Sequence, residues 1–242
     1  MKIKSLFAIL LAFGLVACDN TQAKTAIQIK NELEKTYADK NVKVLSVTKS
    51  PVKGLYEVVF EGNQLLYIDE QGQYIIEGEI LDIKGKKNIT AERMKVLNKI
   101  DASKLNVEDA IKEVRGNGKN IVYVFNDPDC PFCHKLELEF AKMTDITIYT
   151  FLMPIDSLHP KAREHAQQIW CQPERTKVWN AYMRENKPIP KVDFCDNPVE
   201  RNIKLGYSFG FHGTPTLVFP NGTIASGWLP AATLQEAIAK NQ

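Results

Sequence analysis

Two cysteines three residues apart, placed just after a buried strand, constrain this chain more than any other feature. Residues 121–125 are continuously apolar, as expected of a strand covered on both faces of a sheet. A polar turn leads to Cys130-Pro131-Phe132-Cys133, and apolar residues then recur at helical spacing. The pattern predicts a strand, a turn and a helix, with both cysteines at the start of the helix.

The helix N-terminus makes one of these cysteines a candidate nucleophile. Unpaired backbone N–H groups and the helix dipole favour a thiolate at Cys130. Cys133 lies one turn further on, close enough to form a disulfide with Cys130. We therefore predict an exposed attacking thiol at Cys130 and a shielded resolving thiol at Cys133. Asp127 and Asp129 are placed to cap the helix, and their charges would oppose thiolate formation.

Two other interpretations of the C-x-x-C pair have less support. Half of a zinc site would need a second close pair, but Cys171 and Cys195 are far apart and no histidine stands at the usual finger spacing. A purely structural bond would close too short a loop to add much stability. Redox chemistry is therefore favoured. His134, His159 and His165 are expected on exposed helix surfaces without a role, with modulation of the first cysteine as the alternative for His134.

The remaining pair near the C-terminus has a different character. Cys171 and Cys195 enclose 25 residues, counting both ends. The chain-entropy estimate for a disulfide around such a loop is about 3 to 4 kcal/mol. A structural disulfide is the favoured interpretation, and a second redox pair is the alternative.

Residues 1–17 have the form of an export signal. Lys2 and Lys4 precede an apolar run that is short for a membrane span. The run ends in Leu-Val-Ala followed by Cys18, which resembles the lipobox of bacterial lipoproteins and makes Cys18 a candidate lipidation site. The alternative is secretion with cleavage after Ala23. Either way we expect a location outside the cytoplasm, where disulfides persist, with or without an acyl anchor.

The charge balance argues against nucleic acid as a partner. The chain has 31 Lys and Arg against 29 Asp and Glu, a formal +2, and the surplus is accounted for by Lys2 and Lys4. No basic block appears elsewhere, so the clustered charge that phosphate binding requires is missing from the sequence. With 44% hydrophobic and 25% charged residues, the composition is that of a globular protein and excludes disordered, collagen-like and polytopic membrane classes.

The periodicity predicts three parts after the signal. Residues 18–84 combine one amphipathic helix with four or five antiparallel strands, a thin core with free edges that favours pairing with a second copy. Residues 85–115 are expected to be a helical linker, with Thr90 as an N-cap and a second helical piece from Val107 to Val114. Residues 116–242 form a β-α-β unit followed by three helical stretches, a hairpin and a last helix.

Several motifs give the chain a family resemblance. A C-x-x-C after a buried strand, together with Thr214-Pro215 before a late strand, resembles a thioredoxin-like domain, and the Thr-Pro bond is a candidate cis peptide. The whole order of motifs is similar to that of the DsbC/DsbG family of bacterial periplasmic thiol:disulfide interchange proteins. These motifs are residues 64–69, residues 75–78, the linker helix, Cys130 to His134, Trp170-Cys171, Cys195-Asp196 and Gly213 to Pro215.

The resemblance implies both an architecture and an activity. It implies an α+β chain with a small antiparallel-sheet dimerisation domain, a helical linker and a thioredoxin-like catalytic domain that carries a helical insertion. It further implies a homodimer whose cleft receives misfolded exported proteins, with Thr214-Pro215 packed against the active pair. Cys130 and Cys133 would rearrange wrong disulfides without any cofactor, and a membrane reductase of the DsbD type would keep them reduced.

Two alternatives for the function remain open at this point. The dipeptide Pro131-Phe132 departs from the Gly-Tyr of the DsbC branch and is closer to the Pro-Tyr of the DsbG branch. A DsbG-like reductase of oxidised single cysteines is therefore the first alternative. The second is a holdase chaperone whose cleft binds unfolded chains without chemistry. A disulfide donor of the DsbA type is disfavoured because such proteins lack the N-terminal sheet domain.

Overall fold

The computed structural model describes residues 24–40 and 42–242. The expected signal segment, the lipidation site at Cys18 and the alternative cleavage after Ala23 lie outside these residues. None of the helices in the described ranges has the length and apolar character needed to cross a membrane. The chain divides into two compact units, one ending at Ile80 and the other beginning at Leu81.

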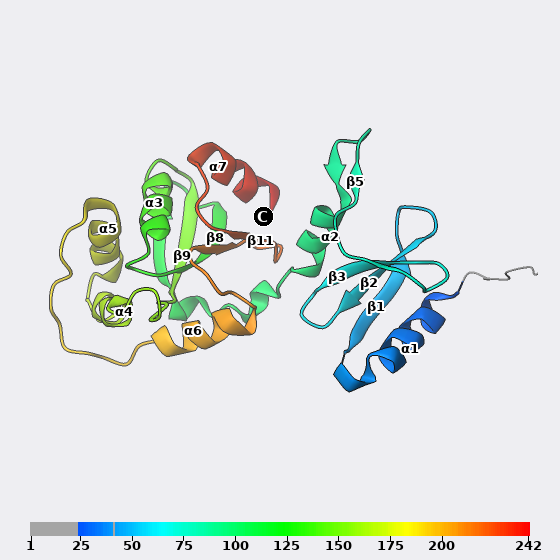
Figure 1. The fold of residues 1–242 in the computed structure, drawn as a ribbon. Helices are drawn as coiled ribbons and strands as arrows, with labels where there is room; N and C mark the ends of the chain where they lie inside the picture. The colour runs from blue at the N-terminus through cyan, green and yellow to red at the C-terminus, as the bar shows by residue number, and fades with distance from the viewer. Residues whose placement is uncertain (1–23, 41) are drawn as a thin grey trace, which may run out of the picture. The chain divides into compact units, whose positions relative to one another are not determined.

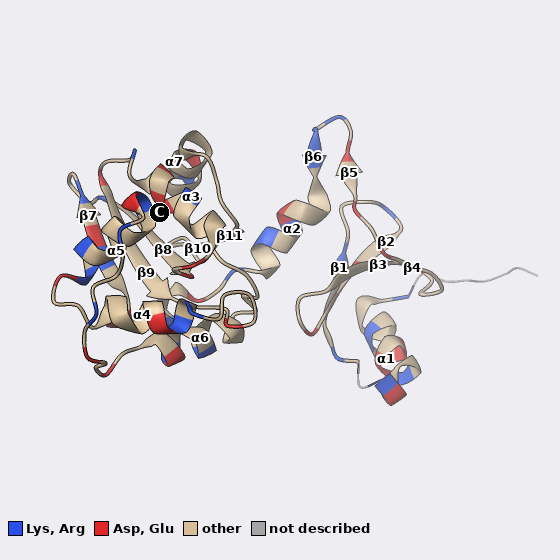
Figure 2. Ribbon diagram, turned by 60° about the vertical axis from the view of Figure 1, so that its left-hand side comes forward, with Lys and Arg blue, Asp and Glu red and all other residues tan. Residues whose placement is uncertain are grey.

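The N-terminal unit packs one helix on a four-stranded antiparallel sheet (Figure 1). Helix α1 (Ala26–Thr36) starts with a capping box between Thr25 and Gln28 and carries basic and acidic residues along its length (Figure 2). The strands lie in the order of the chain, β1 (Val44–Lys49), β2 (Leu55–Phe60), β3 (Leu65–Asp69) and β4 (Ile75–Ile76). The core is small and consists of Ile29, Leu33, Val44, Tyr56, Val58 and Ile68.

Strand β4 leaves an apolar edge on this unit. It pairs with β3 through Ile75 and Ile76, and it is the last strand of its sheet. Both isoleucines and the preceding Tyr74 are exposed. An uncovered strand edge with apolar side chains is a template for further pairing.

The structure differs from the expected helical linker, residues 85–115, at both ends, and the first difference lies at its start. Strands β5 (Leu81–Asp82) and β6 (Lys87–Asn88) form a short hairpin before helix α2 (Ile89–Leu97). The N-cap of α2 is Asn88, whose side chain accepts the N–H of Ala91, and the expected cap Thr90 lies inside the helix.

The prediction of a second linker helix, from Val107 to Val114, is wrong. A single 3₁₀ turn (Val107–Asp109) is followed by strand β7 (Ile111–Arg115), which pairs with β9 at the edge of the C-terminal sheet. Ile111 is buried and Val114 is exposed. The main-chain pairing of β7 with β9 decides the structure here, and it is not visible in the local sequence.

The C-terminal unit is built on a five-stranded sheet in the order β11-β10-β8-β9-β7. The parallel pair β8 and β9 lies inside the sheet, and the remaining pairs are antiparallel. The strands not yet given are β8 (Asn120–Asn126), β9 (Ile146–Leu152), β10 (Thr216–Val218) and β11 (Ile224–Ser226). The connection from β8 to β9 is helix α3 (Pro131–Phe140), the β-α-β unit that the sequence predicts.

Helices cover both faces of this sheet (Figure 1). Helix α3 and the last helix, α7 (Ala231–Lys240), pack on one face through Leu136, Phe140, Leu234 and Ile238. Three helices inserted between β9 and β10 contribute to the core on the other face, namely α4 (Ala162–Trp170), α5 (Arg175–Glu185) and α6 (Val199–Ser208). This α+β architecture, with its small N-terminal antiparallel sheet and its thioredoxin-like C-terminal domain, confirms the predicted fold class.

Candidate active site

The C-x-x-C pair lies at the junction of the central strand β8 and helix α3. Cys130 is the N-cap residue of α3, and Pro131 occupies the first helical turn, where its missing N–H leaves no bond unmade. The carbonyl of Cys130 accepts the N–H groups of Cys133 and His134, at 3.0 and 3.1 Å. Both cysteines are free thiols in this structure. The fold therefore places the pair as the sequence predicts.

The surroundings of the two thiols shift their pKa values in opposite directions. A hydrogen bond from the Cys133 thiol is the largest influence on Cys130. With further hydrogen bonds from the Thr214 side chain and from the N–H groups of Cys133 and Phe132, it outweighs burial and lowers the pKa of Cys130 to about 5. Burial, and then the hydrogen bond and charge of Cys130, raise the pKa of Cys133 well above its ordinary value. At neutral pH the pair thus holds one thiolate and one thiol.

The loop before β10 covers the first cysteine. The peptide bond between Thr214 and Pro215 is cis, and the Cys130 sulfur lies 3.4 Å from the Thr214 carbonyl oxygen. Cys130 is only 6% exposed and Cys133 is fully buried. The expectation of an open thiol at Cys130 is therefore wrong, because the sequence does not show how closely this loop approaches.

Asp127 does not cap the active-site helix. Its buried carboxylate turns back toward its own loop and accepts hydrogen bonds from the N–H of Asp129 at 2.8 Å and the N–H of Ile155 at 2.7 Å. Nδ1 of His159 lies 2.9 Å from the same carboxylate. The segment that follows β9 is thereby tied to the loop that carries Cys130.

Asp129 also finds partners other than the helix. Its Oδ1 lies 2.7 Å from Nδ1 of His165 on α4 and accepts the Tyr182 hydroxyl of α5 at 2.8 Å. Burial, followed by the hydrogen bond with Asp129, raises the pKa of Tyr182, so its hydroxyl stays protonated and donates. Two inserted helices thus hold the residue immediately before Cys130.

His134 is not a solvent-facing helix residue. Its Nδ1 lies 2.9 Å from the Met183 carbonyl and its Nε2 lies 2.8 Å from the Pro128 carbonyl. The ring therefore bridges helix α5 of the insertion and the loop before Cys130. The sequence predicts no role for His159 and His165, but the structure brings all three histidines to this loop. The one sequence signal is the presence of two aspartates beside the C-x-x-C pair, because buried carboxylates require donors.

A buried ion cluster joins the insertion to the active-site helix. Arg184 of α5 lies with Nη2 at 2.7 Å from Glu137 of α3 and 2.6 Å from Glu113 of β7. Burial alone would raise the pKa of Glu113, but the hydrogen bonds and charges of Arg184 and Arg115 lower it. Burial raises the pKa of the fully enclosed Glu137. This cluster fixes α5 against the helix that begins with the reactive cysteine.

Cys171 and Cys195 are joined by a disulfide, with their Cα atoms 5.6 Å apart. The bond connects the end of α4 to the irregular segment between α5 and α6. That segment is held also by side chains of α4 and its C-terminal end, since Gln172 donates to the Pro190 carbonyl and Gln168 accepts the N–H of Val192. Because the two cysteines are bonded to each other, they supply no second pair for a zinc site.

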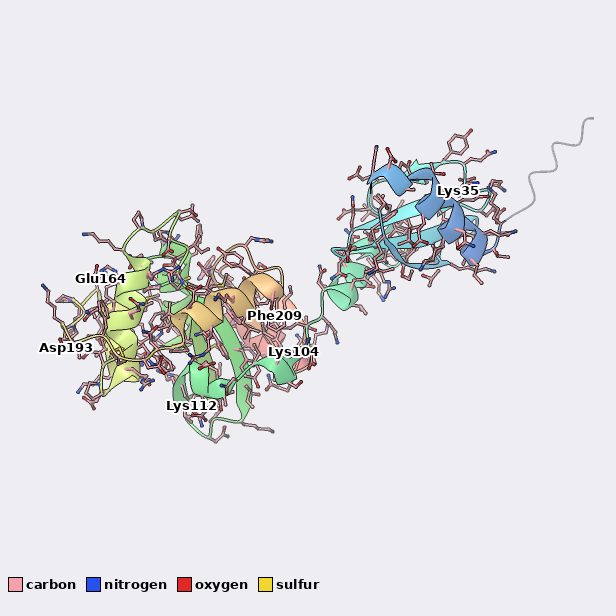
Figure 3. The ribbon with its side chains drawn as sticks, turned by 90° about the horizontal axis from the view of Figure 1, so that it is seen from below. Lys35, Lys104, Lys112, Glu164, Asp193 and Phe209 are labelled. Carbon is pink, nitrogen blue, oxygen red and sulfur yellow. A yellow bond between two sulfur atoms is a disulfide. The ribbon has the colours of Figure 1, made fainter. Side chains whose placement is uncertain are left out.

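The same segment borders a groove of about 860 Å³ next to the Asp129 contacts. The groove is lined by Glu164, His165, Gln168, Tyr182, Pro188, Ile189, Lys191, Val192, Asp193 and Phe194. Glu164 and Asp193, labelled in Figure 3, mark its α4 side and its loop side. The groove belongs wholly to the insertion and reaches the active-site loop through His165 and Tyr182.

Comparisons with known families agree with both units. A family model described as "Thioredoxin-like domain" matches residues 107–242, and one described as "Disulfide bond isomerase protein N-terminal domain" matches residues 16–91.

Named relatives extend this similarity over most of the chain. The probable thiol:disulfide interchange protein DsbC of Bordetella avium is 36% identical over 197 residues, which are 81% of this chain and 70% of the relative. The thiol:disulfide interchange protein DsbC of Escherichia coli (strain K12) is 27% identical over 212 residues, 87% of either chain. A crystal structure of a disulfide interchange protein from Neisseria gonorrhoeae is 57% identical, with a TM-score of 0.56, and covers 57% of this chain and 99% of its own.

These relatives favour the DsbC branch over the DsbG-like alternative, although the dipeptide between the cysteines is Pro131-Phe132. The two matched domains and the thiol pair at the start of α3 agree with them. The chain belongs to the thiol:disulfide interchange protein DsbC family and is a thiol–disulfide oxidoreductase.

Proposed function

We propose that this protein rearranges wrong disulfides in proteins exported to the periplasm, with Cys130 as the attacking thiol and Cys133 as the resolving thiol. The single observation that carries the assignment is the placement of the two sulfurs, since Cys130 is the N-cap residue of α3 and Cys133 is fully buried one turn further on. Donors around Cys130 lower its pKa to about 5, whereas burial raises the pKa of Cys133. The thiolate is the nucleophile in disulfide exchange.

The reaction begins when the Cys130 thiolate attacks one sulfur of a substrate disulfide. A bond forms between Cys130 and that sulfur, and the other substrate sulfur leaves as a thiolate. A second substrate thiolate can then displace Cys130, which gives a rearranged disulfide with no net oxidation. Thr214, whose carbonyl lies 3.4 Å from the Cys130 sulfur, and Pro215 border the position that the substrate sulfur must approach.

A second outcome reduces the substrate and oxidises the enzyme. If no substrate thiol arrives, Cys133 loses its proton and attacks the mixed disulfide at Cys130, and the substrate leaves as a thiol. The Cys130–Cys133 bond that results must be reduced by two electrons before the next round. A membrane thiol reductase of the DsbD type is the partner that we propose for this step.

The test is a trapping experiment with the resolving cysteine removed. A Cys133→Ala variant should accumulate mixed disulfides with a scrambled substrate, visible as high-mass bands on non-reducing gels that vanish with reductant. Cys130→Ser is the matched control and should give none. If Cys133→Ala forms no adduct while both variants still suppress aggregation of unfolded chains, the holdase interpretation replaces ours.

We also propose that the active form is a homodimer joined through the N-terminal unit. The matched N-terminal domain of disulfide bond isomerases, the small core and the exposed apolar edge at β4 support this assembly. A chain that starts at Leu81 should be monomeric in sedimentation and keep exchange with small thiols, but lose isomerase activity. A monomeric full-length chain with intact isomerase activity would contradict the proposal.

The location and the mature N-terminus remain part of the proposal. We propose a periplasmic protein whose Cys18 is acylated after signal cleavage, as the lipobox-like sequence suggests. The intact mass of the protein purified from a cell envelope decides between an acylated Cys18 and a plain N-terminus after Ala23. It also counts the disulfides when it is repeated after reduction and alkylation.

A further inference from the structure

A fully buried carboxylate belongs to the loop that leads to the attacking cysteine. Asp127 is 0% exposed, and its three hydrogen-bond contacts are the N–H of Asp129, the N–H of Ile155 and the ring of His159. The backbone carbonyl of Asp127 also accepts the N–H of Cys130, at 3.2 Å. Asp127 therefore links the segment after β9, through its buried carboxylate, to the attacking cysteine, through its backbone carbonyl.

A bare charge at this position would work against the thiolate. A buried carboxylate without a counter-charge is unstable, and a negative charge beside a thiol raises the pKa of that thiol. His159, with a side chain 21% exposed, stands in contact with this carboxylate. Burial opposes protonation of its ring, but the hydrogen bond and charge of Asp127, followed by the charge of Cys130, raise the pKa of His159.

The other titratable groups around the pair have partners of their own. Asp129 contacts His165 of α4 and Tyr182 of α5. His134 of α3 faces two backbone carbonyls. Cys133 stays a neutral thiol because burial raises its pKa, and the loop before β10 contributes the carbonyl of Thr214. The charge on Asp127 is thus left for His159 to balance.

We propose that His159 is a positioning residue for Cys130, because its protonated ring neutralises the Asp127 carboxylate and thereby lets Cys130 persist as a thiolate at neutral pH. This inference rests on the proposed role of Cys130 and deepens it. Coupling between two sites is reciprocal. Reduction of the disulfide, which gives Cys130 its charge, therefore also favours protonation of His159.

A titration of the wild-type protein tests this reciprocity. The histidine ring signals of the full-length chain are titrated by NMR in the oxidised and in the fully reduced protein, with His159 identified by its loss in His159→Gln. We expect His159 to titrate at higher pH in the reduced protein. Equal midpoints in the two redox states would overturn the proposal.

A second test measures the thiolate directly. The rate of Cys130 alkylation is followed against pH in reduced His159→Gln, where the midpoint should rise by about one pH unit, so that alkylation at pH 5 is about fivefold slower. The rate at high pH should equal that of the wild type. The double variant Asp127→Asn/His159→Gln, which removes both charges, should return the midpoint toward the wild-type value.

The matched control is Lys161→Gln, which removes an exposed positive charge at the N-cap position of α4 without touching Asp127. It should leave the midpoint unchanged. An unchanged midpoint in His159→Gln, or no recovery in the double variant, would show that His159 does not act through the charge of Asp127. If Cys133 is alkylated before Cys130, the proposed function itself fails instead. Should His159→Gln not fold, the NMR titration decides, with the histidine signals assigned through the backbone.

Discussion

The two cysteine pairs of this protein differ in exposure, and the less exposed pair is the one proposed to react. The reactive pair, Cys130 and Cys133, is buried, whereas Cys171 is half-buried and Cys195 is exposed. The pairs also sit at opposite helix ends, since Cys130 is the N-cap of α3 and Cys171 is the C-cap of α4. A helix N-terminus stabilises a thiolate, and a C-terminus, with its partial negative charge, destabilises one.

Under the proposed assignment, hydrogen-bond donors rather than exposure distinguish the pair that reacts from the pair that does not. Cys130 is surrounded by the Cys133 thiol and by N–H groups that lower its pKa. Cys171 receives one such contact, the N–H of Cys195 at 2.9 Å. The first environment stabilises a reduced, charged pair. The second fastens a loop that lacks regular secondary structure.

The largest expected difference between the pairs is in catalysis. Cys130→Ser removes the nucleophile and should lower the rate of disulfide exchange at least about 10³-fold. The double variant Cys171→Ser/Cys195→Ser should keep the rate within about twofold at a temperature where it is folded. Reduction of a small-molecule disulfide, followed by the release of its thiol, measures both. A comparable loss in the two proteins would make Cys171 and Cys195 a second redox pair.

The next effect concerns the ion cluster that joins the insertion to the reactive pair's helix. Arg184→Met leaves Glu113 and Glu137 without their cation, and breaking a buried pair in this way costs about 3–5 kcal/mol. The free energy of unfolding in urea measures the loss. Lys177→Met on the same helix breaks an exposed pair with Glu174 and should change it by less than about 0.5 kcal/mol. Equal effects would mean that the cluster does not fix α5.

Loss of the Cys171–Cys195 disulfide should lower the stability of the folded protein. Its cysteines are 24 residues apart, and removing the bond costs about 3 to 4 kcal/mol in the chain-entropy estimate. For a protein of this size the melting temperature should fall by roughly 10 °C, which calorimetry measures on the double serine variant.

Selective reduction is a further test of the difference between the two disulfides. In a mild thiol buffer the Cys130–Cys133 bond should open first, because its reduced form is stabilised by the donors around Cys130. Mass spectrometry after alkylation should then show Cys171–Cys195 intact. Equal ease of reduction would contradict the structural role of the second pair.

A smaller effect is expected in the pH dependence of stability of the reduced protein. The pKa of Cys130 is lower in the folded chain, about 5, than in an unfolded one. The stabilisation from the thiolate is therefore complete above the unfolded pKa, declines as the pH falls, and is lost below about 5. The melting temperatures of reduced wild type and Cys130→Ser should change relative to each other over this range. Parallel curves would show that Cys130 has an ordinary pKa.

Much of this fold could be predicted from the sequence because its signals are local. The continuous apolar run of β8, the helical spacing after Cys130 and the helix-plus-strands pattern of the N-terminal part agree with the structure. Strand β7 was missed because its pairing with β9 is a long-range contact that leaves only a weak pattern in residues 111–115. The cap of α2 was misplaced by two residues for a different, local reason, since both Asn88 and Thr90 can cap a helix.

The site was predictable only in its sulfur chemistry. The C-x-x-C spacing and its place at a helix start indicate a redox pair, and the late Thr214-Pro215 indicates its neighbour. The partners of Asp127 and Asp129 outside their own loop lie 28 to 53 residues away in the sequence. No local pattern connects them, because the insertion between β9 and β10 brings them together only after folding.

The most direct test of the account is the pH profile of alkylation for each cysteine of the fully reduced wild-type protein, resolved by peptide mass spectrometry. We expect Cys130 to be modified first, with a midpoint at about pH 5, and Cys133 to remain unmodified until the pH is well above the range of an ordinary thiol. Faster modification of Cys133, or a Cys130 midpoint near the ordinary cysteine value of about 8.5, would contradict the assignment of Cys130 as a thiolate activated by its hydrogen-bond donors.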